Sequence, residues 1–204
     1  MAFACTPDEE NYGPRSKSPN TLPDSLATEW MYILNEGNYT WGNASVTGVN
    51  LVNGAAYQEL FKVVNEIPLG DVAQSMFVRN DTGWVVVNNS GKIEVVDLPS
   101  FQRLYTIENM QSPRYIDCIG DTCYITDLYA NHIYVKTCEG QEITQLKHNG
   151  LADEIKVVDN SIWVVTTPDS TSTVTSLNRY TGAFQETILE GARSVFFDKD
   201  ALYW

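Results

Sequence analysis

The chain has 204 residues, of which 43% are hydrophobic and 19% are charged. This composition allows a substantial buried core, so we do not expect a disordered chain. Acidic residues outnumber basic ones by 26 to 13, which gives a formal net charge of −13. Such a charge repels polyanions, and we expect no nucleic-acid partner. The sequence contains no apolar run of about eighteen residues, the length that a membrane-spanning helix needs.

The first residues resemble the end of a bacterial lipoprotein signal. Phe3-Ala4-Cys5 is similar to the last residues of a lipobox, and acidic residues follow Cys5 as in the surface-export signal of some Gram-negative lipoproteins. Residues 6–27 are rich in Pro, Ser, Asn and charge, a composition typical of an unfolded tether. The resemblance implies that residues 1–27 are a lipoprotein anchor, acylated at Cys5, and a flexible tether, so that membrane contact is made only through lipid. The alternative is a disordered N-terminus with an accidental cysteine.

Short apolar segments recur with a fixed period along the rest of the chain. Four of them follow a polar turn and begin with an aromatic residue, at Trp84, Tyr124, Trp163 and Tyr203, in steps of 40, 39 and 40 residues. Another apolar segment precedes each one across a turn that contains Asn, Asp or Gly, residues that accept the positive φ of hairpin turns. Two more apolar segments complete each period.

Four antiparallel strands in about 40 residues are typical of one blade of a β-propeller. No segment has a helical period over three turns. Three complete repeats are therefore expected between residues 74 and 188. Their strands are predicted at 76–78, 84–87, 93–96 and 104–107; at 115–116, 124–126, 133–135 and 143–146; and at 156–158, 163–165, 174–177 and 184–188.

Incomplete units flank these repeats. Residues 30–65 supply three strands of an earlier unit, and the sequence reaches Trp204 inside a fifth unit. We therefore predict an all-β fold, in which residues 28–204 form an incomplete β-propeller of about four to five blades, each a four-stranded antiparallel sheet. A propeller closes so that no blade edge is left unpaired, and this sequence has no closing strand. It is expected to be the N-terminal part of a seven-bladed propeller.

Motifs for catalysis and for metal binding are missing from the sequence. The only histidines, His132 and His148, are sixteen residues apart and belong to no HExxH pattern, and no CxxC spacing occurs near them. The sequence also lacks a glycine-rich phosphate loop and a GxSxG motif. We expect no enzymatic activity, no metal and no cofactor.

The cysteines have a structural interpretation. Cys118 and Cys123 flank the turn at Gly120-Asp121 and are expected to lie opposite each other at a non-hydrogen-bonded position, with Cα atoms about 4.5–5.5 Å apart. That separation is within reach of a disulfide, and an exported protein meets an oxidising environment. Two buried free thiols are the alternative. Cys138, on the adjacent strand, is a rival partner.

One face of the predicted propeller is the candidate binding surface. Loops that join the second and third strands of a blade share this face with the loops that join successive blades. Aromatic rings, amides and few charges in these loops suit a large neutral or weakly charged ligand. Alternatively, Asp71 and Gln74 bond backbone groups at a blade junction, and Arg114 pairs with an acidic neighbour beside the central channel. The candidate ligand contacts are Asn38, Tyr39, Trp41, Asp71, Gln74, Asn88, Asn89, Arg114 and Tyr129.

The same loops carry a family resemblance. Asn35-Glu36-Gly37-Asn38, the segment 69–76, Val87-Asn88-Asn89-Ser90 and Ser112-Pro113-Arg114-Tyr115 resemble the surface-layer-type propeller lipoproteins of gut Bacteroidetes. Within that group the sequence is most similar to the cell-surface vitamin B12-binding propellers. The resemblance extends from about Met31 to Ile125 and then weakens to a general blade pattern.

This resemblance implies a location, a ligand and a partner. It implies a lipid-anchored protein on the cell surface, at the outer membrane, that captures cobalamin or a related corrinoid and passes it to an outer-membrane TonB-dependent transporter. Cobalamin also suits the loop chemistry, because its rim amides pair with Asn and Gln and its apolar edges contact Tyr and Trp. The alternative function is a propeller that mediates protein or glycan interaction at the cell surface, since aromatic platforms also stack on sugars.

Overall fold

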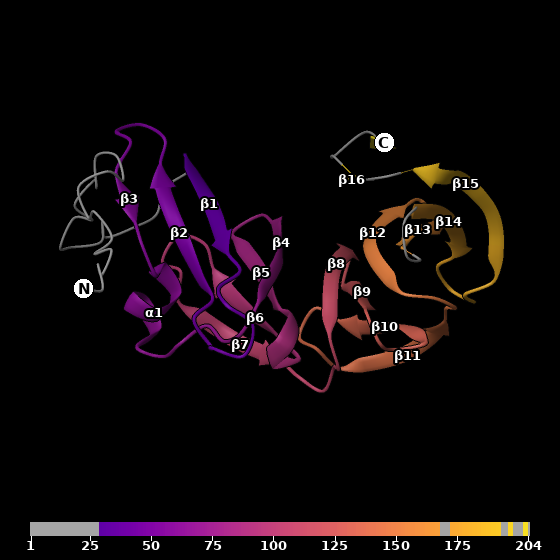
Figure 1. The fold of residues 1–204 in the computed structure, drawn as a ribbon, viewed down its shortest axis with the longest axis horizontal. Helices are drawn as coiled ribbons and strands as arrows, with labels where there is room; N and C mark the ends of the chain where they lie inside the picture. Colours follow the sequence, from indigo (N-terminus) through magenta and orange to yellow (C-terminus); the bar gives the residue numbers. More distant parts are fainter. Residues whose placement is uncertain (1–28, 168–171, 193–195, 198–201, 204) are drawn as a thin grey trace, which may run out of the picture.

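The computed structural model describes residues 29–167, 172–192, 196–197 and 202–203. Cys5 and the predicted tether lie outside the described residues. Within them the protein is all-β, and its strands form separate antiparallel sheets, each made from consecutive segments of the chain (Figure 1). No helix in the described part of the chain is long and apolar enough to cross a membrane.

Five sheets follow one another along the chain. Sheet 1 consists of β1 (Trp30–Asn35), β2 (Ser45–Asn50) and β3 (Ala56–Tyr57). Sheet 2 consists of β4 (Ala73–Arg79), β5 (Thr82–Val87), β6 (Lys92–Asp97) and β7 (Arg103–Ile107). Sheet 3 consists of β8 (Pro113–Ile119), β9 (Thr122–Asp127), β10 (His132–Thr137) and β11 (Glu142–Lys147). Sheet 4 consists of β12 (Ala152–Val158), β13 (Ser161–Thr166), β14 (Ser172–Asn178) and β15 (Phe184–Ala192), and sheet 5 of β16 (Phe196–Phe197) and β17 (Leu202–Tyr203).

The predicted strand pattern is confirmed for the three complete repeats, which are sheets 2, 3 and 4. Some strand boundaries differ from the prediction: Gln74 lies inside β4 and Arg114 inside β8, rather than in the loops before them, and β15 extends beyond the predicted 184–188 to Ala192. The prediction also missed α1 (Leu60–Asn65), because six residues are too few to show a helical period.

The sheets stand side by side along an arc, with β4, β8 and β12 toward its concave side (Figure 1). Consecutive first strands are neighbours, since β4 contacts β8 and β8 contacts β12. This succession of four-stranded antiparallel sheets is the arrangement of propeller blades. The protein therefore has a propeller-like all-β fold.

The hydrophobic core is divided among the interfaces between successive sheets. Along β5, Trp84 and Val86 belong to the cluster shared with sheet 3, whereas Val85 and Val87 belong to the cluster shared with sheet 1. A third cluster joins sheets 3 and 4. Because successive side chains on a strand point to opposite faces, a strand buried on both faces needs a continuous apolar run. The period of aromatic-aliphatic segments in the sequence reflects this requirement.

A repeated backbone hydrogen bond identifies the place of β1 in its sheet. The residue after each third strand donates its N–H to the carbonyl just before the second strand: Leu98 to Asp81, Cys138 to Asp121, and Arg179 to Asn160. In sheet 1, the residue after β2, Leu51, donates in the same way to Glu29, just before β1. β1 therefore occupies the position of a second strand.

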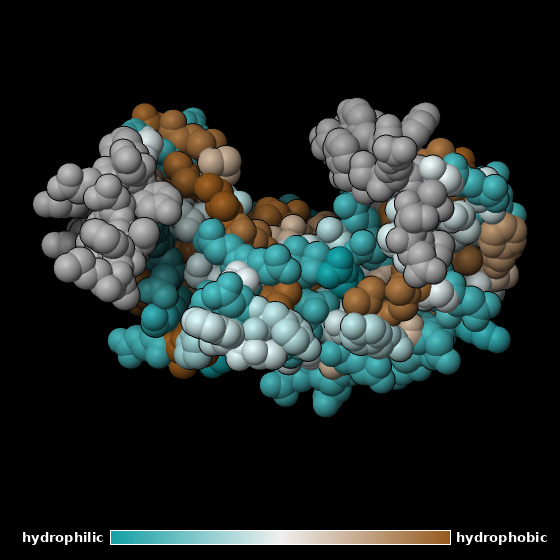
Figure 2. All heavy atoms as spheres, viewed as in Figure 1, coloured by the Kyte–Doolittle hydropathy of each residue, from teal (hydrophilic) through white to brown (hydrophobic). Residues whose placement is uncertain are grey.

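No first strand is paired with β1 in the described part of the chain. Its residue Ile33 is 41% exposed, whereas Val85, in the corresponding part of β5, is fully buried. Figure 2 shows hydrophobic surface over β1, on the concave side of the arc. The edge of sheet 1 thus leaves apolar surface and backbone hydrogen-bonding groups uncovered.

Phe101 is an exception within an otherwise regular turn. The turn between the third and fourth strands contains a residue with positive φ in every one of sheets 1 to 4, namely Gly54, Phe101, Gly140 and Gly182. A phenylalanine is strained at φ 57°, yet its side chain is fully buried and packs against Tyr32 with ring centroids 5.2 Å apart. Packing between sheets 1 and 2 thus compensates for the backbone strain.

Replacing Phe101 with alanine should lower the free energy of unfolding by about 3–5 kcal/mol, because the substitution empties a fully buried site and keeps the strained backbone. Urea unfolding followed by circular dichroism measures this change. Phe184→Ala is the matched control, since Phe184 is 62% exposed, and it should change stability by less than about 1 kcal/mol. Equal losses in the two variants would contradict this account of the interface.

Candidate functional site

The strand ends of each sheet form two faces. The turn face comprises the turns between first and second strands (80–81, 120–121 and 159–160) and between third and fourth strands (98–102, 138–141 and 179–183); the opposite ends form the loop face. The loop face comprises the loops at 36–44, 88–91, 128–131 and 167, together with the inter-sheet segments at 69–72, 108–112 and 148–151. Repeated hydrogen bonds join the two kinds of loop in sheets 2, 3 and 4. In these bonds the backbone N–H of the loop residue donates to a carbonyl of the inter-sheet segment: Asn88 to Val72 (2.8 Å), Leu128 to Ser112 (2.9 Å) and Thr167 to Leu151 (3.2 Å).

Asp71 connects two loops of this face. Its Oδ2 accepts hydrogen bonds from the backbone N–H of Thr40 (2.8 Å) and from the side-chain amide of Asn89 (2.5 Å). Its own backbone N–H donates to the hydroxyl of Ser90 (2.9 Å). A carboxylate that accepts several hydrogen bonds holds the donor groups firmly, so the β1–β2 loop is fixed against the start of the β5–β6 loop.

The β1–β2 loop presents aromatic side chains to solvent. Tyr39 is 70% exposed and Trp41 is 73% exposed. The loop backbone is nevertheless ordered by local hydrogen bonds, from Trp41 N–H to the carbonyl of Asn38 (3.0 Å) and from Asn38 N–H to Oδ1 of Asn43 (2.7 Å). The exposed rings therefore stand on a loop of defined shape.

Asp127 organises the equivalent loop of sheet 3. Its carboxylate is fully buried and accepts four backbone N–H groups: those of Gln111 and Ser112 at Oδ2, and those of Tyr129 and Ala130 at Oδ1, over 2.8–3.1 Å. One side chain thus fixes both the inter-sheet segment and the β9–β10 loop. The ring of Tyr129, in that loop, is 70% exposed.

Arg114 joins three sheets along the concave side of the arc. Its guanidinium donates to Oδ1 of Asp153 in β12 (3.0 Å) and to Oε1 of Gln74 in β4. These residues occupy corresponding positions at the beginning of β4, β8 and β12 and lie 40 and 39 residues apart. Arg114 thus pairs with an acidic neighbour, as the alternative interpretation of the sequence had it, whereas Gln74 bonds the Arg114 guanidinium and not a backbone group.

A cleft of about 330 Å³ runs along the same first strands. Its lining includes Gln74, Tyr115, Asp117 and Lys156. The carboxylate of Asp117 is already bonded within the protein, since its Oδ2 accepts a hydrogen bond from the backbone N–H of Val157 (2.8 Å) and lies 3.5 Å from Nζ of Lys156. Burial, the largest cause, raises the pKa of the Tyr115 hydroxyl above its usual range, so this phenol stays neutral at physiological pH.

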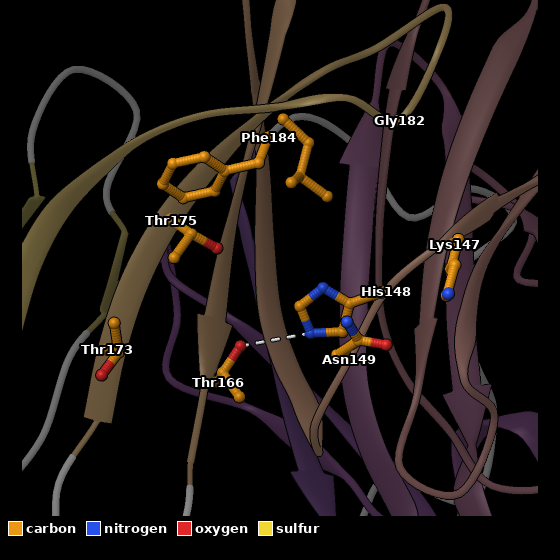
Figure 3. A pocket seen from close by; sticks show the side chains of 9 residues that line it. Lys147, His148, Asn149, Thr166, Thr173, Thr175, Gly182 and Phe184 are labelled. Carbon is orange, nitrogen blue, oxygen red and sulfur yellow. Dashed lines mark hydrogen bonds between the residues drawn. The ribbon is translucent and has the colours of Figure 1, made fainter.

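A larger cleft, of about 470 Å³, lies between sheets 3 and 4. Figure 3 shows His148 and Asn149 on one side of it and Thr173, Thr175 and Phe184 on the other. The cleft exists because small residues replace large ones on the third strand. In sheet 3 the corresponding positions are His132 and Tyr134, whose rings pack at 4.4 Å. The sequence did not reveal this, because the strand register was needed to align the residues.

The imidazole of His148 is buried in this cleft. Its Nε2 lies 3.2 Å from the hydroxyl of Thr166 (Figure 3). Burial lowers the pKa of His148 below its ordinary value of 6.5, because the low-dielectric surroundings disfavour the charged ring. Among the described residues that line the cleft there is neither a carboxylate nor a cysteine.

The three cysteines of the described residues lie on the turn face, away from the aromatic loops. The predicted disulfide between Cys118 and Cys123 is present, with their Cα atoms 4.0 Å apart, closer than the expected separation. Cys138 is a free, buried thiol. The three sulfur atoms lie within 4.8 Å of one another and form the one group of potential metal ligands found among the described residues.

The structure therefore divides the predicted contact residues into two groups. Asn38, Tyr39, Trp41 and Tyr129 are exposed on the loop face. The amide of Asn88 donates to the carbonyl of Pro113 (2.9 Å), so that Asn88, like Asp71, Asn89, Gln74 and Arg114, is engaged with other parts of the protein. The residue that sequence reasoning missed is Asp127. An aspartate at the end of an apolar strand, just before a loop, was the available signal.

The fold and the loop face together define a propeller-like all-β protein. No family model and no curated protein matches the sequence. The chain is similar in structure to hydrazine synthase of Kuenenia stuttgartiensis (TM-score 0.58, 15% identity, covering 74% of this chain and 44% of that one). It is also similar to the computationally designed protein Ika8 (0.55, 14%, 79% and 49%) and to the dihydro-heme d1 dehydrogenase NirN (0.54, 11%, 78% and 38%).

These similarities concern the fold alone, because each identity is 15% or lower. The chain spans less than half of the length of hydrazine synthase, Ika8 and NirN. The blade-like arrangement of the sheets is thus shared with larger proteins of different kinds. Function must be argued from the loops.

Asp127→Ala should lower the free energy of unfolding by about 3 kcal/mol or more, because four backbone N–H groups would lose a charged acceptor. Asp121→Ala is a suitable control, since Asp121 lies in an exposed turn and only its backbone carbonyl takes part in the repeated hydrogen bond, from the N–H of Cys138. That control should stay within about 0.5 kcal/mol of the parent. Chemical denaturation of both variants provides the comparison, and similar small losses would refute the role of Asp127.

The lowered pKa of His148 predicts a pH-dependent stability. Below pH 6.5 the unfolded chain binds a proton at His148 that the folded protein resists, so stability falls as the pH drops from 6.5 toward the folded-state pKa. His148→Gln, which keeps a polar group beside Thr166, should lose less stability between pH 7 and pH 5 than the parent protein. Urea titrations at the two pH values measure the difference. Parallel losses in both proteins would contradict the prediction.

Proposed function

We propose that this protein binds a ligand with its loop face and catalyses no reaction, and that the ligand is cobalamin or a related corrinoid. The observation behind the proposal is the exposure of Tyr39, Trp41 and Tyr129 on loops that carboxylates hold in place. Large exposed aromatic rings on well-ordered loops favour binding, because little conformational entropy is lost when a ligand covers them. The carboxylates of Asp71 and Asp127 serve the loop backbones.

Each part of the loop face has a distinct role in this proposal. Tyr39, Trp41 and Tyr129 contact the apolar edges of the corrin, and Asn38 pairs with its rim amides. Asn88 and Asn89 fix the β5–β6 loop through the bonds to Pro113 and Asp71. Gln74 and Arg114 are positioning residues that hold the first strands together beneath the face.

The proposal also includes how the propeller closes and where in the cell the protein is located. We propose that these sheets belong to a closed seven-bladed propeller, in which a further strand pairs with the free edge of β1. The exposed Met31 and Ile33 on that strand support this closure. The lipobox-like Phe3-Ala4-Cys5 supports a lipid-anchored protein at the outer membrane. There, a TonB-dependent transporter would receive the ligand.

Isothermal calorimetry with cyanocobalamin tests the ligand. Trp41→Ala and Tyr129→Ala should each weaken binding by about ten- to hundredfold, which corresponds to about 1–3 kcal/mol, because each removes a stacking surface from the face. The fold should be retained, since both rings are largely exposed. Tyr180→Ala is the matched control: Tyr180 is 62% exposed but lies in the turn after β14, on the turn face. Its removal should leave the affinity unchanged.

Two outcomes would overturn this assignment. Unchanged cobalamin affinity in both Trp41→Ala and Tyr129→Ala would show that the ligand binds elsewhere. Binding of an oligosaccharide panel without binding of cobalamin would favour the alternative function, a propeller that recognises glycans at the cell surface.

A further inference from the structure

The turn face contains a compact group of three sulfur atoms within sheet 3. Cys118 lies in β8, Cys123 in β9, and Cys138 just after β10. All three side chains are buried, at 9%, 0% and 7% exposure. Cys118 and Cys123 form the disulfide, and Cys138 remains a thiol.

The free thiol is held beside the disulfide by the strand register. Lys136 of β10 pairs with Cys123 of β9. Cys138 follows Lys136 by two residues, so its side chain lies on the same side of the sheet as that of Cys123. The backbone N–H of Cys138 donates to the carbonyl of Asp121 (3.0 Å), and its carbonyl accepts from the hydroxyl of Tyr105 (2.9 Å). As a result, Sγ of Cys138 lies 3.6 Å from Sγ of Cys123.

A cation from the neighbouring sheet faces the same sulfur. Nη2 of Arg79, at the end of β4, lies 3.1 Å from Sγ of Cys138, and Nη1 donates to the carbonyl of Gly120 (2.6 Å). The thiolate is the nucleophile in disulfide chemistry. The site therefore contains a thiol, a disulfide sulfur 3.6 Å away, and a guanidinium beside the thiol sulfur.

We propose that these residues form an intramolecular thiol–disulfide exchange site. The thiolate of Cys138 attacks Sγ of Cys123, the Cys118–Cys123 bond breaks, and a Cys123–Cys138 bond forms. Cys118 leaves as a thiolate and takes up one proton, which replaces the proton that Cys138 lost. The exchange involves no net oxidation or reduction, so it needs no external reagent.

The two covalent isomers differ in what they connect. The first isomer links β8 to β9 within one hairpin, across five residues of sequence. The second links β9 to the turn after β10, across fifteen residues, and frees Cys118. Exchange thus decides whether β8, the strand that begins near Arg114, is covalently tied to its neighbour.

Tryptic mapping under non-reducing conditions distinguishes the isomers without ambiguity. Cleavage after Arg114, Lys136 and Lys147 places Cys118 and Cys123 in peptide 115–136 and Cys138 in peptide 137–147. The first isomer gives an internal bond in 115–136 and an alkylated Cys138. The second gives the two peptides joined together, with Cys118 alkylated. Folded protein kept at about pH 8.5 and then quenched in acid should yield the joined peptides, because thiolates increase with pH.

Variants make the test sharper. Cys118→Ser leaves Cys123 and Cys138 and should form their disulfide on mild oxidation, whereas Cys138→Ser should never yield joined peptides. Arg79→Gln should slow the appearance of joined peptides by about tenfold, because it removes the cation beside the attacking sulfur. Folded parent protein that yields no joined peptide at about pH 8.5 would overturn the proposal. A folded Cys118→Ser variant whose two cysteines both stay alkylated after oxidation would do so as well.

Discussion

Packing between successive sheets is the constraint on which the rest of the structure depends. The middle strands of sheets 2 and 3 are buried on both faces, so each of these sheets requires a neighbour on either side. A repeat of about 40 residues then brings corresponding positions of adjacent sheets together. Gln74, Arg114 and Asp153 show this directly, since the three side chains are neighbours in space at nearly constant separation in sequence.

The same packing separates two faces with different chemistry. On the loop face, carboxylates are used to fix loop backbones, and aromatic rings are left in solvent. On the turn face, short turns repeat one backbone hydrogen bond, and the three cysteines are buried against Arg79 of the preceding sheet. Ligand capture on one face and disulfide exchange on the other are therefore independent proposals, and the failure of one leaves the other intact.

The sequence predicted the strands well because burial on both faces leaves a strong local pattern. Trp84, Tyr124 and Trp163 each begin an apolar run after a turn, and all three runs are second strands. Features that depend on contacts between distant residues were not predictable in this way. The burial of Asp127, the positive φ of Phe101 and the cleft beside His148 arise from neighbouring strands.

The candidate site was predictable only in part, for a related reason. The exposure of Trp41 and Tyr129 on loops was predictable, because an aromatic residue in a polar loop is visible in the sequence. Arg114 was expected to contact either ligand or protein, and only the position of Asp153 on the next first strand favours the second role. A residue type indicates what a side chain can bind, whereas the packing of sheets determines whether it is already engaged.

Hydrogen–deuterium exchange with and without cyanocobalamin tests most directly whether the loop face is the binding surface. The account predicts slower amide exchange on ligand addition at residues 36–44 and 127–131. It predicts no change at the turn-face segments 119–122 and 179–183, which lie on the other side of the same sheets. Protection of the turn face, or unchanged exchange at both loops with saturating ligand, would contradict it.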